Sequence, residues 1–258
     1  MKHLLTLIIV AWFFFHPVTT VHGFGWGFKP SRDETLPDVG IYGELIKNRL
    51  AFYADFTEEK HIYLTFDNGY EQGHTASILD ILKKHDVPAT FFVTGHYVKS
   101  EPELIKRMVD EGHIIGNHSY THPDFTKLSK AEMAKELKMV EKAVKELTDQ
   151  KEMVYVRPPR GMFNENTLRW AEELGYIHIF WSVAFKDWEV DRQRGWEYAY
   201  NQMMQQVHPG AIVLLHTVSE DNAKALDQII TDLKERGYSF KSLDDLALKH
   251  LFDDALFF

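Results

Sequence analysis

From residue 61 onward, short apolar runs alternate with amphipathic segments, and this alternation constrains the fold more than any other feature of the sequence. Strands are predicted at residues 62–66, 89–93, 113–116, 153–157, 176–182, 211–215 and 239–241. Helices are predicted between them, at residues 75–85, 101–111, 130–147, 164–174, 195–207 and 223–236. Strands that alternate with helices form parallel sheets, so we expect an α/β domain. Periodicity alone leaves open whether the sheet closes into a barrel.

Composition narrows the class of protein. A chain of 258 residues that is 45% hydrophobic can bury a large core, and one α/β domain is expected. The formal net charge of −9 argues against a general nucleic-acid or membrane-surface binder, because such proteins need basic patches. The absence of cysteine excludes a disulfide framework, a thiolate metal site and a cysteine nucleophile, and it suits folding outside a reducing cytosol.

The N-terminus indicates export. A lysine and a histidine precede an apolar run at residues 4–15, which has the length of a signal-peptide core and is short for a membrane span. We expect residues 1–23 to be a signal peptide; a retained anchor and a buried N-terminal helix are the alternatives. Residues 24–60 are expected to form an irregular lead-in, followed by the main domain at residues 61–258.

Unusual polar and aromatic residues follow five of the predicted strands. They are Asp67 and Asn68 after the first strand, His118 and His122 after the third, Arg157 and Arg160 after the fourth, Asp187 and Trp188 after the fifth, and His216 after the sixth. In a β/α barrel the carboxyl ends of the strands meet at one face, which carries the active site. The sequence therefore predicts that these residues converge on one site.

The residue types suggest hydrolytic chemistry. Asp67 closes a strand at a turn and is the candidate base, while His216 ends a buried strand and is the candidate acid. Two histidines four residues apart, His118 and His122, can present their nitrogens to one divalent ion, commonly zinc. Asn68 or a nearby carboxylate could add an oxygen ligand.

Two further segments carry candidate binding residues. Arg157 and Arg160 flank Pro158 and Pro159, whose rings stiffen the loop, and a planar guanidinium is well shaped to hold a carboxylate. Trp188 is a candidate wall of a sugar-binding cleft, because exposed aromatic rings stack on sugars.

Five stretches carry a family resemblance. TFDNG, HSYTH, RPPRG, WSVAFKDW and LLH, in this order and over roughly residues 60–245, resemble the motifs of the polysaccharide deacetylase family, carbohydrate esterase family 4, also called the NodB homology domain. The phrases YLTFDNGYE, GHIIGNHS and HPGAI resemble in particular the muramic-acid deacetylases of spore-forming bacilli, the delta-lactam-biosynthetic de-N-acetylases. The resemblance implies a distorted (β/α) barrel of about seven parallel strands and metal-assisted removal of acetyl groups from N-acetylated sugars.

The resemblance also implies roles for individual residues. The catalytic residues would be Asp67 as the base, His216 as the acid, Arg157 as the partner that orients Asp67, and Asp187 as the tether of His216. The divalent ion, expected to be zinc, would be bound by His118 and His122, with Asn68 in the place of a usual aspartate. The substrate would contact Leu214 through its acetyl methyl group and Trp188, Tyr70, Pro159 and Arg160 through the rest of the sugar.

Three positions depart from the common family pattern. Asn68 replaces an anionic ligand, which should weaken metal binding and leaves the identity and necessity of the metal open. Ala184 stands where most relatives have an acid, so Asp187 is the candidate tether of His216. Arg160 stands where many relatives have an aromatic residue, and it could hold the lactyl carboxylate of N-acetylmuramic acid.

The sequence therefore predicts an exported enzyme that removes the acetyl group of N-acetylmuramic acid in peptidoglycan, leading to the muramic delta-lactam of spore cortex. Its partner would be a glycan strand without the stem peptide; we expect a monomer in the cell wall or cortex, with no nucleic-acid partner and no stable membrane span. The alternatives are a deacetylase of N-acetylglucosamine, chito-oligomers or acetylated xylan, a catalytically retired glycan-binding domain, and an intracellular sugar-binding regulator. No residue announces a lactam-closing step.

Overall fold

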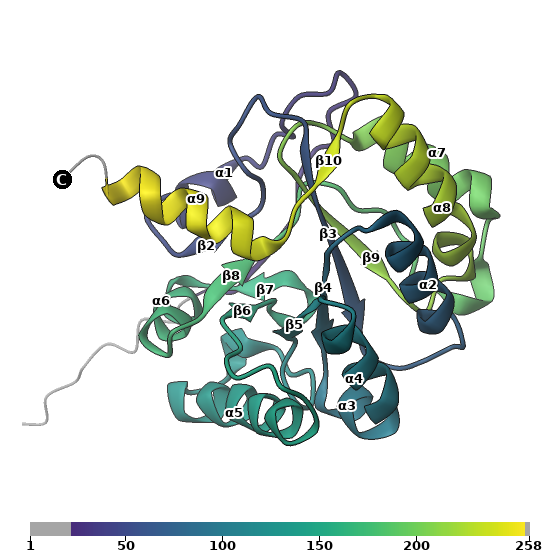
Figure 1. The fold of residues 1–258 in the computed structure, drawn as a ribbon. Coiled ribbons are helices and arrows are strands. Elements are labelled where there is room, and N and C mark those ends of the chain that lie inside the picture. The colour runs from purple at the N-terminus through teal and green to yellow at the C-terminus, as the bar shows by residue number, and fades with distance from the viewer. Residues whose placement is uncertain (1–21, 256–258) are drawn as a thin grey trace, which may run out of the picture.

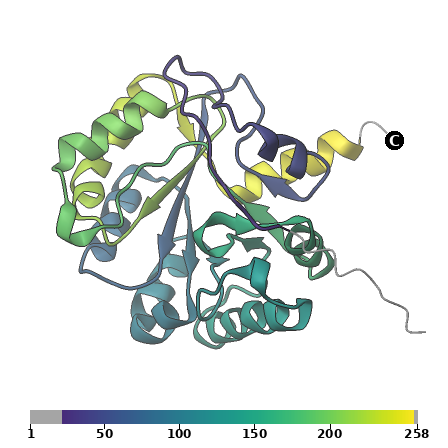
Figure 2. The same cartoon turned by 180° about the vertical axis from the view of Figure 1, so that it is seen from behind.

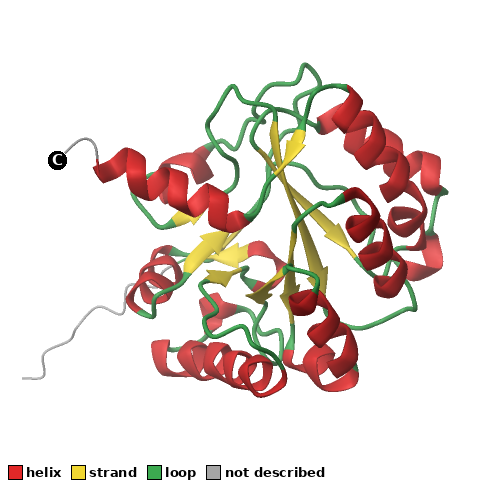
Figure 3. Cartoon of the chain, in the orientation of Figure 1, coloured by secondary structure: helices red, strands yellow, loops and turns green. Residues whose placement is uncertain are grey.

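A computed structural model of the chain describes residues 22–255, so the predicted signal peptide lies almost entirely outside the described residues. Within this range a central sheet is surrounded by helices (Figures 1 and 3). The strands of the sheet are β2 (Ala51–Phe52), β3 (His61–Asn68), β4 (Ala89–Val93), β5 (Ile114–Asn117), β6 (Tyr155–Val156), β8 (Ile177–Ile179), β9 (Ala211–His216) and β10 (Ser239–Phe240). The helices are α1 (Ile41–Ile46), α2 (Thr75–His85), α3 (Gly95–Ser100), α4 (Pro102–Asp110), α5 (Lys130–Leu147), α6 (Glu165–Glu173), α7 (Trp196–Gln206), α8 (Glu220–Glu235) and α9 (Leu243–Ala255).

The sheet is parallel throughout its described strands. Its order is β10-β3-β4-β5-β6-β8-β2, and β9 pairs with β3 as well. A parallel bridge between Val183, after β8, and Val213 in β9 joins distant parts of this path and curls the sheet toward a barrel. The predicted α/β fold, a distorted barrel of about seven parallel strands, is confirmed, with β2 as an additional short strand.

Residues 24–60 are more regular than the sequence indicated. Besides α1 and β2, they contain β1 (Phe24–Gly25), which pairs antiparallel with β7 (Met162–Phe163). The purple segment that leads to α1 runs across the face turned to the viewer in Figure 2. Two-residue strands leave no periodic signal in a sequence, which explains why this part was expected to be irregular.

The two faces of β3 contact different parts of the core. Ile62, Leu64 and Phe66 belong to the large apolar cluster that also includes residues of the surrounding helices, whereas Tyr63 belongs to a cluster formed mainly by strand residues. Side chains alternate along a strand, so Asp67 continues the face of Tyr63 and Asn68 the opposite face. This alternation decides what each polar residue at the end of β3 can reach.

The described part of the chain also contains three single-turn 3-10 helices, η1 (Phe125–Lys127), η2 (Pro159–Gly161) and η3 (Val190–Arg192). The helix expected at residues 101–111 is present as α4, and Pro102 occupies its first turn, where the missing amide hydrogen costs nothing. No helix among residues 22–255 has the length and apolar character needed to cross a membrane.

Candidate active site

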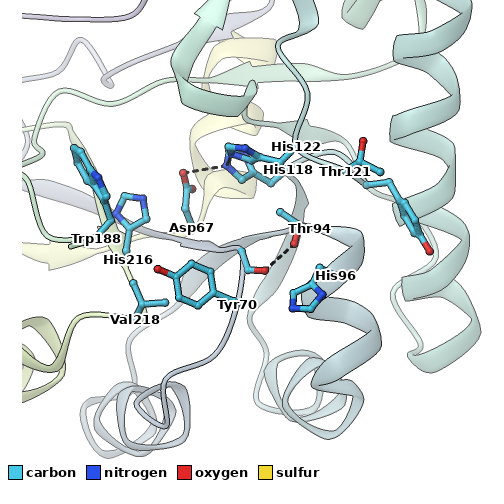
Figure 4. Close-up of a pocket in the computed structure, with 12 residues that line it drawn as sticks. Asp67, Tyr70, Thr94, His96, His118, Thr121, His122, Trp188, His216 and Val218 are labelled. Carbon is cyan, nitrogen blue, oxygen red and sulfur yellow. Dashed lines mark hydrogen bonds and ion pairs between the residues drawn. The ribbon is translucent and has the colours of Figure 1, made fainter. Parts of the chain in front are cut away.

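A cavity of about 410 Å³ lies at the carboxyl ends of the central strands (Figure 4). Residues at the carboxyl ends of β3 and β9 and in the segments after β3, β4, β5 and β9 line it, together with Trp188 from the segment after β8. The lining residues are Asp67, Gly69, Tyr70, Thr94, His96, His118, Tyr120, Thr121, His122, Trp188, His216 and Val218.

Asp67 is held at the floor of this cavity by Arg157. Nη1 of Arg157 donates to Oδ1 of Asp67 at 2.8 Å, and Nη2 donates to the hydroxyl oxygen of Thr65 at 2.8 Å. Nε of Arg157 donates to the carbonyl of Ile179 at 3.1 Å, and the guanidinium lies 4.2 Å above the ring of Phe92. Arg157 is fully buried, so these contacts fix the direction of its fork and, through it, the orientation of the carboxylate.

The surroundings keep Asp67 ionised. Burial would raise the pKa of Asp67, but its neighbours His118, Arg157 and His216 outweigh this effect, and the pKa lies below its ordinary value. Oδ1 is occupied by Arg157, while Oδ2 lies 3.5 Å from Nε2 of His118. A carboxylate with one oxygen held and the other facing the cavity can accept a proton there.

His118 and His122 lie next to each other in the lining of the same cavity, with their Nε2 atoms 3.2 Å apart. Nδ1 of His118 lies 2.9 Å from the carbonyl of Arg157, and because a carbonyl only accepts, Nδ1 carries the proton and Nε2 presents a lone pair. Burial lowers the pKa of both imidazoles, and burial together with His118 brings that of His122 to about 4. Both rings are therefore neutral at physiological pH.

The loop between these histidines has an uncommon backbone. Ser119 and His122 both adopt positive φ values, 64° and 59°, which are unusual for residues other than glycine. The hydroxyl oxygen of Ser119 accepts the amide hydrogen of His122 at 3.0 Å, and the amide of Ser119 donates to the side chain of Asn117 at 3.0 Å. These bonds stabilise the turn that directs both imidazoles to one point.

Asn68 takes a different direction from Asp67. Its Nδ2 donates to the hydroxyl of Thr217 at 2.8 Å, its Oδ1 has no hydrogen-bond partner among the described residues, and its side chain is fully buried. It is not among the residues that line the cavity. The structure therefore brings His118 and His122 together and places the amide of Asn68 against the segment after β9.

The donor set at the cavity fits a divalent ion bound by two neutral imidazole nitrogens. The hydrogen bond from His118 to the carbonyl of Arg157 is the kind of contact that orients a ligating histidine. Within residues 22–255 no group of three or more histidine, cysteine, aspartate or glutamate side chains is placed to hold a metal ion.

His216 faces the cavity from the end of β9, and Asp187 contacts it from below. Nδ1 of His216 lies 2.7 Å from Oδ1 of Asp187, and the backbone amide of His216 donates to Oδ2 at 2.8 Å. Burial favours the neutral imidazole, but the charge of Asp187 and its hydrogen bond outweigh burial, so the pKa of His216 is raised. Its Nε2 can then donate a proton into the cavity.

Aromatic side chains form the opening. The ring of Trp188 lies 5.5 Å from the ring of His216 and is 47% exposed, and Tyr70, which is 43% exposed, lies beside His216 in Figure 4. Both present apolar surface at the mouth of the cavity, as a sugar ring requires.

The structure sorts the residues predicted from the sequence into three positions. Those that line the cavity are Asp67, Tyr70, His118, His122, Trp188 and His216. Three residues lie behind the lining: Arg157 contacts Asp67, Asp187 contacts His216, and Leu214 lies on the same face of β9 as His216. Those outside the lining are Asn68, Pro159 and Arg160. Arg160 is exposed, and it adopts a left-handed backbone with a φ of 58°.

Sequence reasoning missed part of the lining. Thr94 and His96 follow β4, Tyr120 and Thr121 lie between the two histidines' positions in the chain, and Val218 follows β9. Thr94 is the first polar residue after an apolar strand, so the strand-end argument applied to the other clusters would have found it. Its hydroxyl also donates to the carbonyl of Gly69 at 3.1 Å and so links two of the loops.

Comparisons with known proteins agree with this geometry. The model of the polysaccharide deacetylase family matches residues 54–179. The peptidoglycan-N-acetylmuramic acid deacetylase PdaA of Bacillus subtilis is 57% identical over 225 residues, which cover 87% of this chain and 86% of that protein. Its solved structure, a family 4 carbohydrate esterase, matches with a TM-score of 0.87 and 54% identity over 90% of this chain and 100% of that one.

A relative of a different kind also matches. A family 4 carbohydrate esterase pseudoenzyme from Bacillus anthracis is similar in structure, with a TM-score of 0.71 and 35% identity. The match covers 76% of this chain and 68% of the pseudoenzyme.

Proposed function

This chain belongs to the polysaccharide deacetylase family, and we propose that it hydrolyses the N-acetyl group of N-acetylmuramic acid in peptidoglycan. The observation that carries the reaction type is one cavity that holds a buried carboxylate, Asp67, and an imidazole of raised pKa, His216. The name of the Bacillus subtilis relative supports the substrate. Amide hydrolysis needs a group that accepts a proton and one that donates a proton at the same pH, and these two residues can supply them.

In the proposed reaction, Asp67 takes a proton from water as the water oxygen bonds to the acetyl carbonyl carbon. Arg157 holds Oδ1 of Asp67, so Oδ2 is the oxygen that receives the proton. The bond between that carbon and the sugar nitrogen then breaks, and His216 gives its proton to the departing amine. The products are acetate and a muramic-acid residue with a free amine.

We further propose that His118 and His122 hold a divalent ion, expected to be zinc, as the family implies. Such an ion would polarise the acetyl carbonyl, which is a poor electrophile without a nearby positive charge. Asn68, the third ligand expected from the sequence, donates to Thr217 and lies outside the cavity lining.

The substitution Asn68→Asp tests this ligand set. We expect unchanged affinity for Zn²⁺ in calorimetric titration, because residue 68 contacts Thr217 rather than the cavity. A clear gain in affinity would place residue 68 beside the ion. His122→Ala serves as the matched control, and it should weaken binding because it removes one of the two imidazoles.

Arg160 is the proposed determinant of substrate choice. Its charge adds to the effects of burial and His118 that lower the pKa of His122, which supports a position near the cavity. The side chain of Arg160 is exposed, so its guanidinium can bind the lactyl carboxylate of peptide-free N-acetylmuramic acid.

We expect Arg160→Tyr to lower kcat/KM on peptide-free glycan strands more than on neutral chito-oligomers. Loss of one charged hydrogen-bonding contact is worth about 1.5–3 kcal/mol, or roughly a 10- to 100-fold difference between the two substrates. Arg236→Tyr, an exposed arginine at the far end of α8, is the control. Equal losses on both substrates would contradict the assignment.

The substrate itself is tested by mass analysis of muropeptides after treatment of peptidoglycan with the protein. Loss of acetyl from muramic acid is the expected result, and Asp67→Asn should abolish it. Loss of acetyl from N-acetylglucosamine instead would favour the chito-oligomer alternative. Glycan binding without any release of acetate would favour a retired domain, for which the pseudoenzyme relative is a precedent.

The setting of this reaction is also a proposal. Residues 1–23 would direct export, residues 61–258 would form the deacetylase domain behind a lead-in at residues 24–60, and the enzyme would act as a monomer in the cell wall or spore cortex. Its substrate would be a glycan strand whose muramic acid has lost the stem peptide. The freed amine could then form the muramic delta-lactam with the lactyl carboxyl group.

A further inference from the structure

Asp187, which contacts His216, is itself held by a residue from a different element. Oδ2 of Asp187 accepts a hydrogen bond from Nδ2 of Asn222 at 2.6 Å, in addition to the backbone amide of His216 at 2.8 Å. Asn222 lies in the first turn of α8, 35 residues further along the chain than Asp187. Asp187 is only 6% exposed and Asn222 only 2%, so water contributes little to this contact.

The same amide group reaches both members of the pair. Nδ2 of Asn222 lies 3.2 Å from the backbone carbonyl of His216 and 2.6 Å from the carboxylate of Asp187. An asparagine side chain has two amide hydrogens, and each is matched to one of these acceptors. Asn222 therefore connects the carboxylate that binds the imidazole to the backbone that carries the imidazole.

Asn222 occupies this position at a cost. Its Oδ1 is buried and has no partner among the described residues, and an unpaired buried acceptor costs about 1–3 kcal/mol. An aspartate at this position would place a second negative charge against Asp187, and an apolar residue would leave the carboxylate with fewer donors. The hydrogen bonds that Nδ2 donates therefore account for an asparagine at position 222.

We propose that Asn222 is a positioning residue for the catalytic acid, holding Asp187 so that Nε2 of His216 points to the departing amine. This inference rests on the proposed function. Without Asn222, the carboxylate keeps only donors from His216 itself and can turn about its own side-chain bonds. The imidazole would then lose its fixed direction, and proton transfer to the amine would slow while the rest of the cavity stays in place.

Leaving groups of different basicity test this proposal. An amide needs a proton on its nitrogen before the bond breaks, whereas the acetate ester of an acidic phenol releases a stable phenolate without one. The test is to compare kcat/KM of the full-length protein on glycan and on p-nitrophenyl acetate, with His216→Ala as the reference for complete loss of the acid.

We expect Asn222→Ala and the volume-conserving Asn222→Leu to lower kcat/KM on the glycan about 10- to 100-fold, part of the 10²–10⁴ that a general acid contributes. The rate on the ester should stay close to wild type. Ser219→Ala is the matched control, because Ser219 caps the same turn of α8 by accepting the amide hydrogen of Asn222 but does not contact Asp187. It should leave the ratio of the two rates unchanged.

A spectroscopic readout is independent of substrate. The proton between Nδ1 of His216 and Asp187 should give a far-downfield NMR resonance in the wild type that broadens or disappears in both Asn222 variants and persists in Ser219→Ala. Equal losses on the two substrates, or an unchanged resonance, would overturn the proposal. If the wild type releases no acetate from glycan, the proposed function fails, while the resonance still tests the contact made by Asn222.

Discussion

Replacement of Asp187 by asparagine should move the alkaline limit of activity to lower pH. The change is nearly isosteric and removes one negative charge 2.7 Å from Nδ1 of His216. Besides Asp187, the charged groups that act on His216 are Asp67, which raises its pKa, and Arg157, which lowers it together with burial. Without the negative charge of Asp187, burial and the charge of Arg157, which favour the neutral imidazole, are opposed less strongly, so the pKa of His216 should fall.

The size of the shift follows from the contact that is lost. A hydrogen bond to a charged group contributes about 1.5–3 kcal/mol against about 1 kcal/mol for a neutral one, and 1.36 kcal/mol corresponds to one pKa unit. Because the pair is largely buried, solvent screens it little, and the difference of about 0.5–2 kcal/mol corresponds to a fall of about 0.4–1.5 pKa units. The acid must be protonated to act, so activity persists while the pH lies below its pKa and declines above it.

The assay is kcat/KM for acetate release from glycan as a function of pH. We expect the alkaline limb of Asp187→Asn to move down by this amount, while the acid limb stays in place because Asp67 keeps its contact with Arg157. Asp191→Asn, an exposed aspartate in η3 of the same segment, is the control and should leave both limbs unchanged. A uniform loss of activity at every pH, with the alkaline limb unmoved, would refute the reasoning.

Two further predictions concern stability. His178 is fully buried, neither of its ring nitrogens has a hydrogen-bond partner within residues 22–255, and burial lowers its pKa to about 3. Between about pH 6.5 and pH 3 the unfolded chain protonates His178 and the folded chain does not, so the free energy of unfolding falls by about 1.4 kcal/mol for each unit by which the pH drops. In urea unfolding, His178→Phe should lose this share of the pH dependence, and an unchanged pH dependence would contradict the prediction. Arg157→Met leaves the Asp67 carboxylate buried without its partner and should lower the free energy of unfolding by about 3–5 kcal/mol. Arg169→Met, which removes an exposed ion pair, should change it by about 1 kcal/mol or less, and a similar loss in both variants would contradict the role of burial.

The parallel sheet and the meeting of the polar clusters could be predicted because both depend on local patterns. Each apolar run in β3, β5 and β9 ends at a polar residue, and in a parallel sheet such ends lie at one edge. The short strand β2 could not be predicted in this way, because two residues carry no period, and its pairing with β8 joins segments more than a hundred residues apart. The helix α3 was likewise missed, since its six residues span less than two turns.

The contacts that position the site were harder to predict than the residues in it. Asn222 lies one residue before the helix predicted at residues 223–236, and a polar residue there indicates a solvent-exposed helix start. Its contact with Asp187 follows only from how α8, which begins at Glu220, packs in three dimensions. The direction of Asn68 depends on where the strand ends. The sequence predicted an end at residue 66, but β3 extends through Asn68, and because side chains alternate along a strand, Asn68 faces away from the side to which Asp67 points.

The register of two neighbouring strands determines how the base and the acid face each other. Asp67 in β3 and His216 in β9 are direct partners across the parallel pair, and both side chains line the cavity. A slip of one residue would turn every side chain of one strand to the opposite face and would separate the two groups. The hydroxyl of Thr65 fixes this register from inside, because it donates to the carbonyl of Val213 and accepts from Arg157. Arg157, which orients Asp67, thus also contacts Thr65, which aligns β3 with β9. The spacing of Asp67 and His216 is therefore determined by the backbone rather than by flexible side chains.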